Sequence, residues 1–246
     1  EFTGEVLEVG SEAEDLSVGD RVMCRGGSGW AEFALAHWRR TVRIPSDDIP
    51  WEQAACLQGA VQTMHDAIVT NGHFTANQSI LIQGASSGVG LMGLQVARAM
   101  GARLVIGTST NTERRARLAE FGADMALDSG DDSWLEQVLE ATDGNGVDVT
   151  IDMLSGDFVN KIMEATAIHG YIINIGRLAG MSAEFNFDRH AARRLHYIGT
   201  TGRTRSIDEH AEVLRMANDE LGGAVERGEI RSPIDKIFSL EQAAQA

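Results

Sequence analysis

The stretch Ile80-Leu81-Ile82-Gln83-Gly84-Ala85-Ser86-Ser87-Gly88-Val89-Gly90 decides the predicted fold of this 246-residue chain. A short apolar strand runs into a turn of small residues and then directly into a helix. Small residues allow a pyrophosphate to approach the backbone, and the N–H groups at the start of the helix bind phosphate. The turn reads A-x-S-x-x-G instead of the usual G-x-G-x-x-G, so the prediction rests more on its place between a strand and a helix than on the sequence motif. A tight turn without a ligand is the alternative, and we favour nucleotide binding through Ala85, Ser86, Ser87, Gly88, Val89 and Gly90.

Short strands and helices alternate on both sides of this turn. Strands are predicted at 79–83, 104–106, 125–127, 147–151, 171–175 and 196–200, and helices at 91–100, 113–121, 134–141, 158–167 and 207–221. Strict alternation is typical of a parallel sheet covered on both faces. The predicted fold class is therefore α/β, with a Rossmann-type doubly wound parallel sheet.

The ends of the chain follow a different pattern. The first fifty residues predict short strands at 5–9, 20–23 and 31–36, and 51–69 predicts a helix. An arginine-rich polar segment follows Gly176, and a strand is expected at 233–238 before a helix start at Ser239. We expect domains at 1–69, 70–200 and 201–246, with both ends of the chain truncated.

Composition excludes several classes of partner. The formal charge of −15 repels nucleic acid and anionic membrane surfaces, and no apolar run has the length of a membrane span. The two cysteines, Cys24 and Cys56, have no metal or redox spacing. These features predict a soluble protein of a reducing, cytoplasmic compartment that acts on a small molecule.

The residues after the second strand predict which cofactor binds. NAD-binding domains carry an acidic residue about 20 positions beyond the glycines, but no Asp or Glu occurs between Leu104 and Thr112. A carboxylate about 4 Å from a 2′-phosphate would cost several kcal/mol, whereas an arginine contact contributes roughly 1.5–3 kcal/mol. We therefore expect NADPH, with its 2′-phosphate bound by Arg114 and by the hydroxyl of Thr108 or Ser109. Arg115 and Arg117 are expected on a solvated helix face.

Two further strand ends complete the predicted site, because ligands bind at the carboxyl edge of a parallel sheet. Glycines at these strand ends would let a flat ring lie on the backbone. The expected contacts are Met153, Asn174, Ile175, Gly176 and Arg177.

Several segments together resemble the medium-chain dehydrogenases/reductases over nearly the whole chain. They are the glycine turn 84–90, Gly101-Ala102, Phe121-Gly122-Ala123-Asp124, Gly146-Val147-Asp148-Val149, Gly170-Tyr171-Ile172-Ile173, Glu1-Phe2-Thr3-Gly4-Glu5-Val6 and Val18-Gly19-Asp20-Arg21-Val22. The branch that looks most similar is the quinone oxidoreductases, including their p53-inducible type. The resemblance implies part of a β-rich, GroES-like catalytic domain, then an NADP-binding domain, then a return to the first domain.

The same resemblance implies a zinc-independent enzyme. The cysteine lobe that zinc alcohol dehydrogenases carry after the Gly-Asp-Arg-Val turn is missing here. If Thr63 is the family's nicotinamide contact, the position of the third zinc ligand is Gly59, and Cys56 lies nearly one helical turn away. His65 is a candidate pocket wall or proton source, but a packed helix histidine is the simpler interpretation. No catalytic dyad can be named from the sequence.

The implied reaction is hydride transfer from NADPH to a quinone or an α,β-unsaturated carbonyl. The alternatives are an enoyl-thioester reductase excised from a synthase, a non-catalytic NADPH-binding protein, and an NAD-dependent zinc alcohol dehydrogenase. The zinc enzyme is disfavoured by Gly59 and by the missing lobe. The strand at 196–200 is expected at the sheet edge, where relatives form homodimers.

Overall fold

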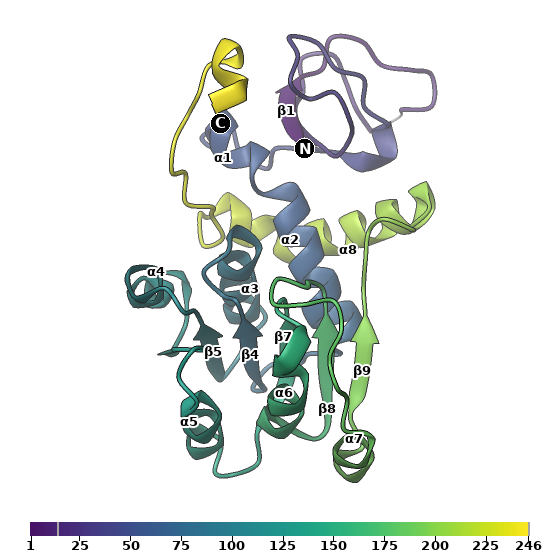
Figure 1. The fold of residues 1–246 in the computed structure, drawn as a ribbon. Helices are drawn as coiled ribbons and strands as arrows, with labels where there is room; N and C mark the ends of the chain where they lie inside the picture. The colour runs from purple at the N-terminus through teal and green to yellow at the C-terminus, as the bar shows by residue number, and fades with distance from the viewer. Residues whose placement is uncertain (14, 246) are drawn as a thin grey trace. The chain divides into compact units, whose positions relative to one another are not determined.

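A computed structural model describes residues 1–13 and 15–245 of the chain (Figure 1). It divides into two compact units, residues 63–201 and residues 1–62 together with 202–246. The division falls inside the helix α2 (Gln58–His65), whereas the sequence predicted a boundary after residue 69. The second division falls after residue 201, next to the predicted boundary after residue 200.

The unit 63–201 is built on a six-stranded sheet in the order β6-β5-β4-β7-β8-β9, and every neighbouring pair is parallel. The strands are β4 (Ser79–Gln83), β5 (Leu104–Thr108), β6 (Met125–Leu127), β7 (Val147–Asp152), β8 (Thr166–Asn174) and β9 (His196–Gly199). Figure 1 shows β5, β4, β7, β8 and β9 side by side. The predicted α/β, Rossmann-like fold class is confirmed.

Helices alternate with these strands. They are α3 (Gly88–Ala99), α4 (Thr112–Ala116), η3 (Leu118–Phe121), α5 (Trp134–Ala141), η4 (Gly156–Phe158), α6 (Val159–Ala165) and α7 (Phe187–Arg193). The helix α3 packs on β4 and β5, and α6 packs on β7 and β8. The core between strands and helices includes the fully buried Leu81, Ile106 and Ile162. This core fixes the carboxyl edge of the sheet, where β4, β5, β7 and β8 end.

Local glycine signals explain where two helical segments stop. Gly101 follows α3 with a φ of 81°, and Gly122 follows η3 with a φ of 100°, so both adopt the left-handed conformation that glycine favours. The helix predicted at 113–121 is divided at Arg117 into α4 and η3. The helix α7, which lies in the arginine-rich segment after Gly176, was not predicted.

The unit formed by 1–62 and 202–246 contains a three-stranded antiparallel sheet, β1 (Phe2–Glu5), β2 (Arg21–Cys24) and β3 (Thr41–Arg43). Its other elements are η1 (Trp38–Arg40), α1 (Trp51–Ala55), the first residues of α2, α8 (Ile207–Glu226) and η5 (Leu240–Gln245). The π-helix η2 (Asp66–Asn71) continues α2 into the other unit. The helix predicted at 51–69 is therefore three segments.

Two predicted strands of this unit are wrong, and a third, predicted at 5–9, overlaps the observed β1 only at Glu5. Residues 31–36 and 233–238 have strand-like composition but pair with no strand among the described residues. The apolar side chains Phe33, Leu35 and Ile237 are exposed, so the burial that makes a pleated surface favourable is missing. None of the helices in the described part of the chain has the length and apolar composition to cross a membrane.

Candidate functional site

The turn after β4 is held against the end of β5 by backbone and hydroxyl hydrogen bonds. Ala85 N donates to Thr108 O (2.8 Å), and Gly84 N donates to Thr108 Oγ1 (3.2 Å). Gly84 has a φ of 73°, which a residue with a side chain rarely adopts. The glycine therefore allows the chain to leave the buried strand and cross to the start of α3.

Ser87 is the N-cap of α3. Its Oγ accepts from Gly90 N (3.1 Å) and donates to Gly84 O (3.1 Å), so one hydroxyl joins the helix start to the turn. An N-cap serine satisfies one of the unpaired N–H groups of the first turn. The helix start thus keeps a positive dipole end at the carboxyl edge of the sheet.

Two glycines of the turn have opposite surroundings. A Cβ built on Gly90 would lie 2.7 Å from Ala85 Cα, Ala85 O and Gly84 O, so the helix can approach the turn only without a side chain there. A Cβ built on Gly88 would meet no atom within 4 Å. Packing explains Gly90 but not Gly88. The open space at Gly88 fits a ligand that lies against the backbone of the turn.

Gln83, at the end of β4, carries a buried polar atom without a partner. Its Oε1 accepts from Thr108 Oγ1 (2.7 Å), while its Nε2 is buried and has no hydrogen bond among residues 1–13 and 15–245. A buried unpaired donor is unfavourable. Gln83 lies directly before the glycine turn, so this donor adds a polar atom to the same edge of the sheet.

The two hydroxyl residues predicted to contact a phosphate are buried within the turn. Thr108 is fully buried, and its hydroxyl bonds Gly84 N and Gln83 Oε1. Ser109 is 4% exposed, and its Oγ lies 2.8 Å from Ser86 Oγ in a hydrogen bond. In this structure both hydroxyls hold the turn in place, and Ser86 is linked to the end of β5.

The arginines after β5 differ from one another. Arg114 is exposed, and its guanidinium has no hydrogen bond or ion pair within the described ranges 1–13 and 15–245. Arg115 instead pairs with Asp128 (2.8 Å) and donates to Ser109 O (2.8 Å). The prediction that Arg115 lies on a solvated face is wrong, because the end of β6 supplies a carboxylate. Arg117 lies on the surface as predicted.

At the ends of β7 and β8, one side chain organises the predicted contacts. The Asp152 Oδ1 accepts from Leu154 N (2.9 Å) and Ser155 N (2.8 Å), and Oδ2 accepts from Asn174 Nδ2 (3.0 Å). The Asp152 carbonyl accepts from Ile175 N (2.9 Å). Asp152 therefore fixes the loop after β7 and the loop after β8 together.

Close contacts complete this arrangement. A Cβ on Gly176 would lie 2.5 Å from Met153 O, so glycine is required where the two loops meet. Met153 is buried, and its Sδ is 3.7 Å from Ser87 Oγ. The structure thus brings the loops after β7 and β8 to the glycine turn, as the sequence predicted for a shared edge.

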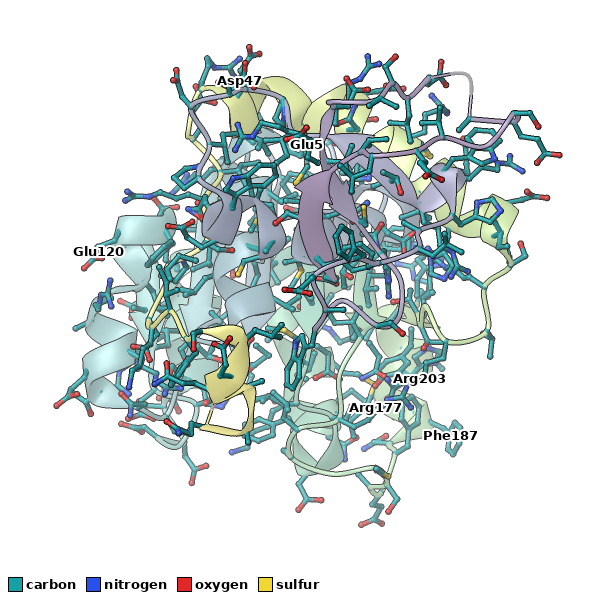
Figure 2. The ribbon with its side chains drawn as sticks, turned by 90° about the horizontal axis from the view of Figure 1, so that it is seen from above. Glu5, Asp47, Glu120, Arg177, Phe187 and Arg203 are labelled. Atoms are coloured by element: carbon teal, nitrogen blue, oxygen red, sulfur yellow. The ribbon has the colours of Figure 1, made fainter. Side chains whose placement is uncertain are left out.

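Tyr197, on β9, is the next neighbour of Asp152. Its hydroxyl donates to Asp152 Oδ2 (3.4 Å). Burial of the Tyr197 hydroxyl, together with the nearby Asp152 charge, raises the pKa of Tyr197 to about 12. Arg177, after β8, and Phe187, at the start of α7, are both exposed, and Figure 2 labels them.

Thr63 and His65 lie on α2. Thr63 is half-buried, and His65 is fully buried, which agrees with a packed helix histidine. Gly59 lies one turn before Thr63 in the same helix, and Cys56 is the C-cap of α1. Among residues 1–13 and 15–245, no group of three or more His, Cys, Asp or Glu side chains is arranged to hold a metal ion.

Sequence reasoning gave no role to the side chains of Gln83, Asp152 and Tyr197 at this edge. A detectable signal existed for the first two, because each is a polar residue that ends an otherwise apolar buried strand. Tyr197 gave no such signal, since its role depends on the register of β9 against β8.

Comparison with known proteins places the chain among oxidoreductases. The family model described as zinc-binding dehydrogenase matches residues 88–219. A quinone oxidoreductase of Pseudomonas aeruginosa is 31% identical over 248 residues, which cover 100% of this chain and 75% of that protein. A mycocerosic acid synthase-like polyketide synthase of Mycobacterium tuberculosis is 33% identical over 148 residues, 60% of this chain and 7% of the synthase.

Solved structures agree with this grouping. Mycobacterial Rv1454c, solved in complex with NADPH, aligns with a TM-score of 0.84 and 25% identity, over 99% of this chain and 75% of that one. The similarity therefore extends over both units of the chain.

Proposed function

This chain belongs to the medium-chain dehydrogenase/reductase family, on its quinone oxidoreductase branch, and we propose that it transfers hydride from NADPH to a quinone or an α,β-unsaturated carbonyl without zinc. The whole-chain similarity to a quinone oxidoreductase and the similarity to an NADPH-bound structure support this proposal. The proposal that zinc is not needed rests on the assignment of Thr63 as the nicotinamide contact, which puts Gly59 where the family's zinc enzymes carry a cysteine.

The residues at the carboxyl edge fit a dinucleotide. The start of α3 and the open space at Gly88 would hold the pyrophosphate, and the loops that Asp152 fixes would lie against the nicotinamide. NADPH supplies the hydride, from C4 of its nicotinamide ring. The chain binds and orients that ring through Met153, Asn174, Ile175 and Gly176, and Thr63 is proposed to contact it.

The choice of NADPH over NADH rests on a difference between the two arginines that follow β5. Arg115 is bound to Asp128, whereas the neighbouring Arg114 has no partner in the described part of the chain. No acidic residue occurs between Leu104 and Thr112 to repel a 2′-phosphate. A charged hydrogen bond from Arg114 contributes roughly 1.5–3 kcal/mol, or about ten- to a hundredfold in affinity.

The test is a pair of equilibrium titrations with NADPH and NADH. Arg114→Ala should weaken NADPH binding about tenfold or more and leave NADH binding unchanged, because only NADPH carries the 2′-phosphate. Arg117→Ala is the matched control, since Arg117 lies on the surface and pairs with Glu120. Unchanged NADPH affinity in Arg114→Ala would remove Arg114 from the site. Tighter binding of NADH than NADPH by the unmodified chain would contradict the cofactor assignment.

Two alternative functions remain: one uses a different hydride acceptor, and the other involves no catalysis. The similarity to a polyketide synthase favours an enoyl-thioester reductase, and a non-catalytic NADPH-binding protein is the other alternative. Oxidation of NADPH should be measured at 340 nm with 9,10-phenanthrenequinone and with crotonyl thioesters. Turnover of the thioester alone would favour the first alternative. Tight NADPH binding without turnover of either acceptor would favour the second.

We also propose that the chain forms a homodimer through β9. This strand lies at the edge of the sheet and leaves one side of its backbone without a strand partner among the described residues. Edge strands are usually paired or covered. Thr200 N donates to Asn174 O, so the neighbouring N–H of Gly199 faces away from β8, because N–H groups alternate in direction along a strand. Replacing Gly199 with proline removes this donor from the open edge, so the dimer should dissociate in light scattering. A monomeric unmodified chain would contradict the proposal.

A reducing, cytoplasmic setting is the last part of the proposal. Cys24 is buried and Cys56 is exposed, and neither forms a disulfide. The proposed partner is a small electrophile, since a net charge of −15 disfavours nucleic acid and anionic membranes.

A further inference from the structure

Ser155, in the loop after β7, has a backbone conformation that residues with a side chain rarely adopt. Its φ is 57° and its ψ is −148°, close to a region that is essentially limited to glycine. Such a conformation costs free energy and persists only where the surrounding structure fixes it. A glycine at position 155 would remove this cost, but it would also remove the hydroxyl of the serine.

The loops after β7 and β8 differ in length between two paired positions. The last paired residues of the two strands are Asp152 and Asn174, and a parallel bridge then joins Ser155 to Gly180. Residue 155 comes three positions after 152, whereas 180 comes six positions after 174, so the loop after β8 has three residues more. These extra residues bulge out of the paired backbone.

The bulge consists of residues 175–177 and is called the arch below. The chain is paired again directly after it, because Leu178 N donates to Met153 O (3.1 Å). The arch carries Ile175 and Gly176, which are proposed to contact the nicotinamide ring. The position of the arch therefore decides where that ring can lie.

The hydroxyl of Ser155 holds the arch from the side of β7. Its Oγ donates to Gly176 O (2.7 Å) and accepts from Asn174 Nδ2 (2.6 Å). The backbone N–H of Ser155 donates to Asp152 Oδ1 (2.8 Å). One serine thus binds the middle of the arch, the strand residue before the arch and the carboxylate at the end of β7. Only a residue with a hydroxyl at this position makes the first two of these contacts.

We propose that Ser155 is a positioning residue, whose strained backbone and hydroxyl fix the arch where it orients the nicotinamide ring. This inference rests on the proposed function, since it requires NADPH at this edge of the sheet. Hydride transfer needs the reacting atoms about 3–3.5 Å apart, so a small shift of the arch slows the reaction. The phosphates are proposed to bind at the start of α3 and at Arg114, so the affinity for NADPH depends little on the arch.

Ser155→Ala and Ser155→Gly separate the strain from the hydroxyl. Both lose the hydroxyl, but only glycine relieves the positive φ, so Ser155→Gly should have the higher Tm of the two, by about 2–4 °C. In single turnovers with 9,10-phenanthrenequinone or a crotonyl thioester, both should transfer hydride about ten- to a hundredfold more slowly than the unmodified chain. Their Kd for NADPH should stay within about twofold of that of the unmodified chain, because the phosphate contacts are unchanged.

Ser28→Gly is the matched control for the substitution itself. Ser28 also has a positive φ (61°), and it is exposed in the unit formed by 1–62 and 202–246. This variant should keep the full rate of hydride transfer. A loss of rate in Ser155→Ala but not in Ser155→Gly would assign the effect to stability and overturn the positioning role.

A second measurement does not depend on turnover. The fluorescence anisotropy of the dihydronicotinamide in bound NADPH should be lower in Ser155→Gly than in the unmodified chain, because the arch no longer holds the ring. If neither acceptor is reduced but this difference is seen, the proposed function fails and the role of Ser155 stands. If the unmodified chain reduces an acceptor, and rate and anisotropy are unchanged in Ser155→Gly, the role of Ser155 is overturned and the proposed function stands.

Discussion

Replacing Gly90 with alanine would place a methyl group 2.7 Å from three backbone atoms, Ala85 Cα, Ala85 O and Gly84 O. Backbone atoms cannot rotate away as a side chain can, so we take the upper part of the usual overpacking cost, about 3 kcal/mol. Alanine gains about 1 kcal/mol over glycine within a helix. The net loss of about 2 kcal/mol should lower Tm by roughly 4–8 °C for a chain of this size.

Gly88→Ala is the matched control, because the same methyl group meets no atom within 4 Å. Its Tm should stay unchanged or rise by a few degrees, since only the helix propensity changes. Its NADPH affinity should nevertheless fall about tenfold, because the methyl group occupies the space proposed for the pyrophosphate. Differential scanning calorimetry and fluorescence titration measure the two effects.

The two variants therefore separate packing from binding. The reasoning about Gly90 is refuted if Gly90→Ala is as stable as the unmodified chain. The proposed place of the pyrophosphate is refuted if Gly88→Ala binds NADPH as the unmodified chain does.

Two further predictions concern titration and exposure. The pKa of Tyr197 is raised to about 12 from an ordinary value of 10, so the unfolded chain loses this proton at a lower pH than the folded chain. The free energy of unfolding should therefore fall between pH 10 and 12. Tyr197→Phe should remove that part of the fall in urea unfolding, and an unchanged pH profile would contradict the buried contact with Asp152. Burial raises the pKa of both thiols, Cys24 and Cys56, so their difference in exposure decides the order of reaction. Iodoacetamide should modify the exposed Cys56 first and the buried Cys24 only on unfolding, as peptide mass spectrometry would show. Faster modification of Cys24 would contradict its burial.

The centre of the sheet could be predicted because β4 and β5 are short, largely apolar runs between turn signals. Ser79–Gln83, Met125–Leu127 and the helix Trp134–Ala141 have the predicted bounds. Amino-acid composition did not predict strands correctly where a strand forms only if another strand pairs with it. Residues 31–36 and 233–238 have the side chains of strands but lack a ladder within the described ranges.

The segments that form the candidate site could be predicted from the sequence, but the partners of their side chains could not. The glycine turn and the strand ends follow from periodicity, which places them at one edge of a parallel sheet. The partners of Arg115 and Asp152 do not, because Asp128 and Tyr197 reach them only through the register of β6 and β9.

The carboxyl group of Asp152 accepts hydrogen bonds from the loop after β7, from Asn174 at the end of β8 and from Tyr197 on the outermost strand. One acidic residue thus joins three segments of the chain through its two carboxylate oxygens. A disturbance at the margin of the sheet, such as a subunit docking on β9, would be transmitted to the loops beside the glycine turn. The proposed dimer contact on β9 and the proposed nicotinamide site would then share one residue, Asp152.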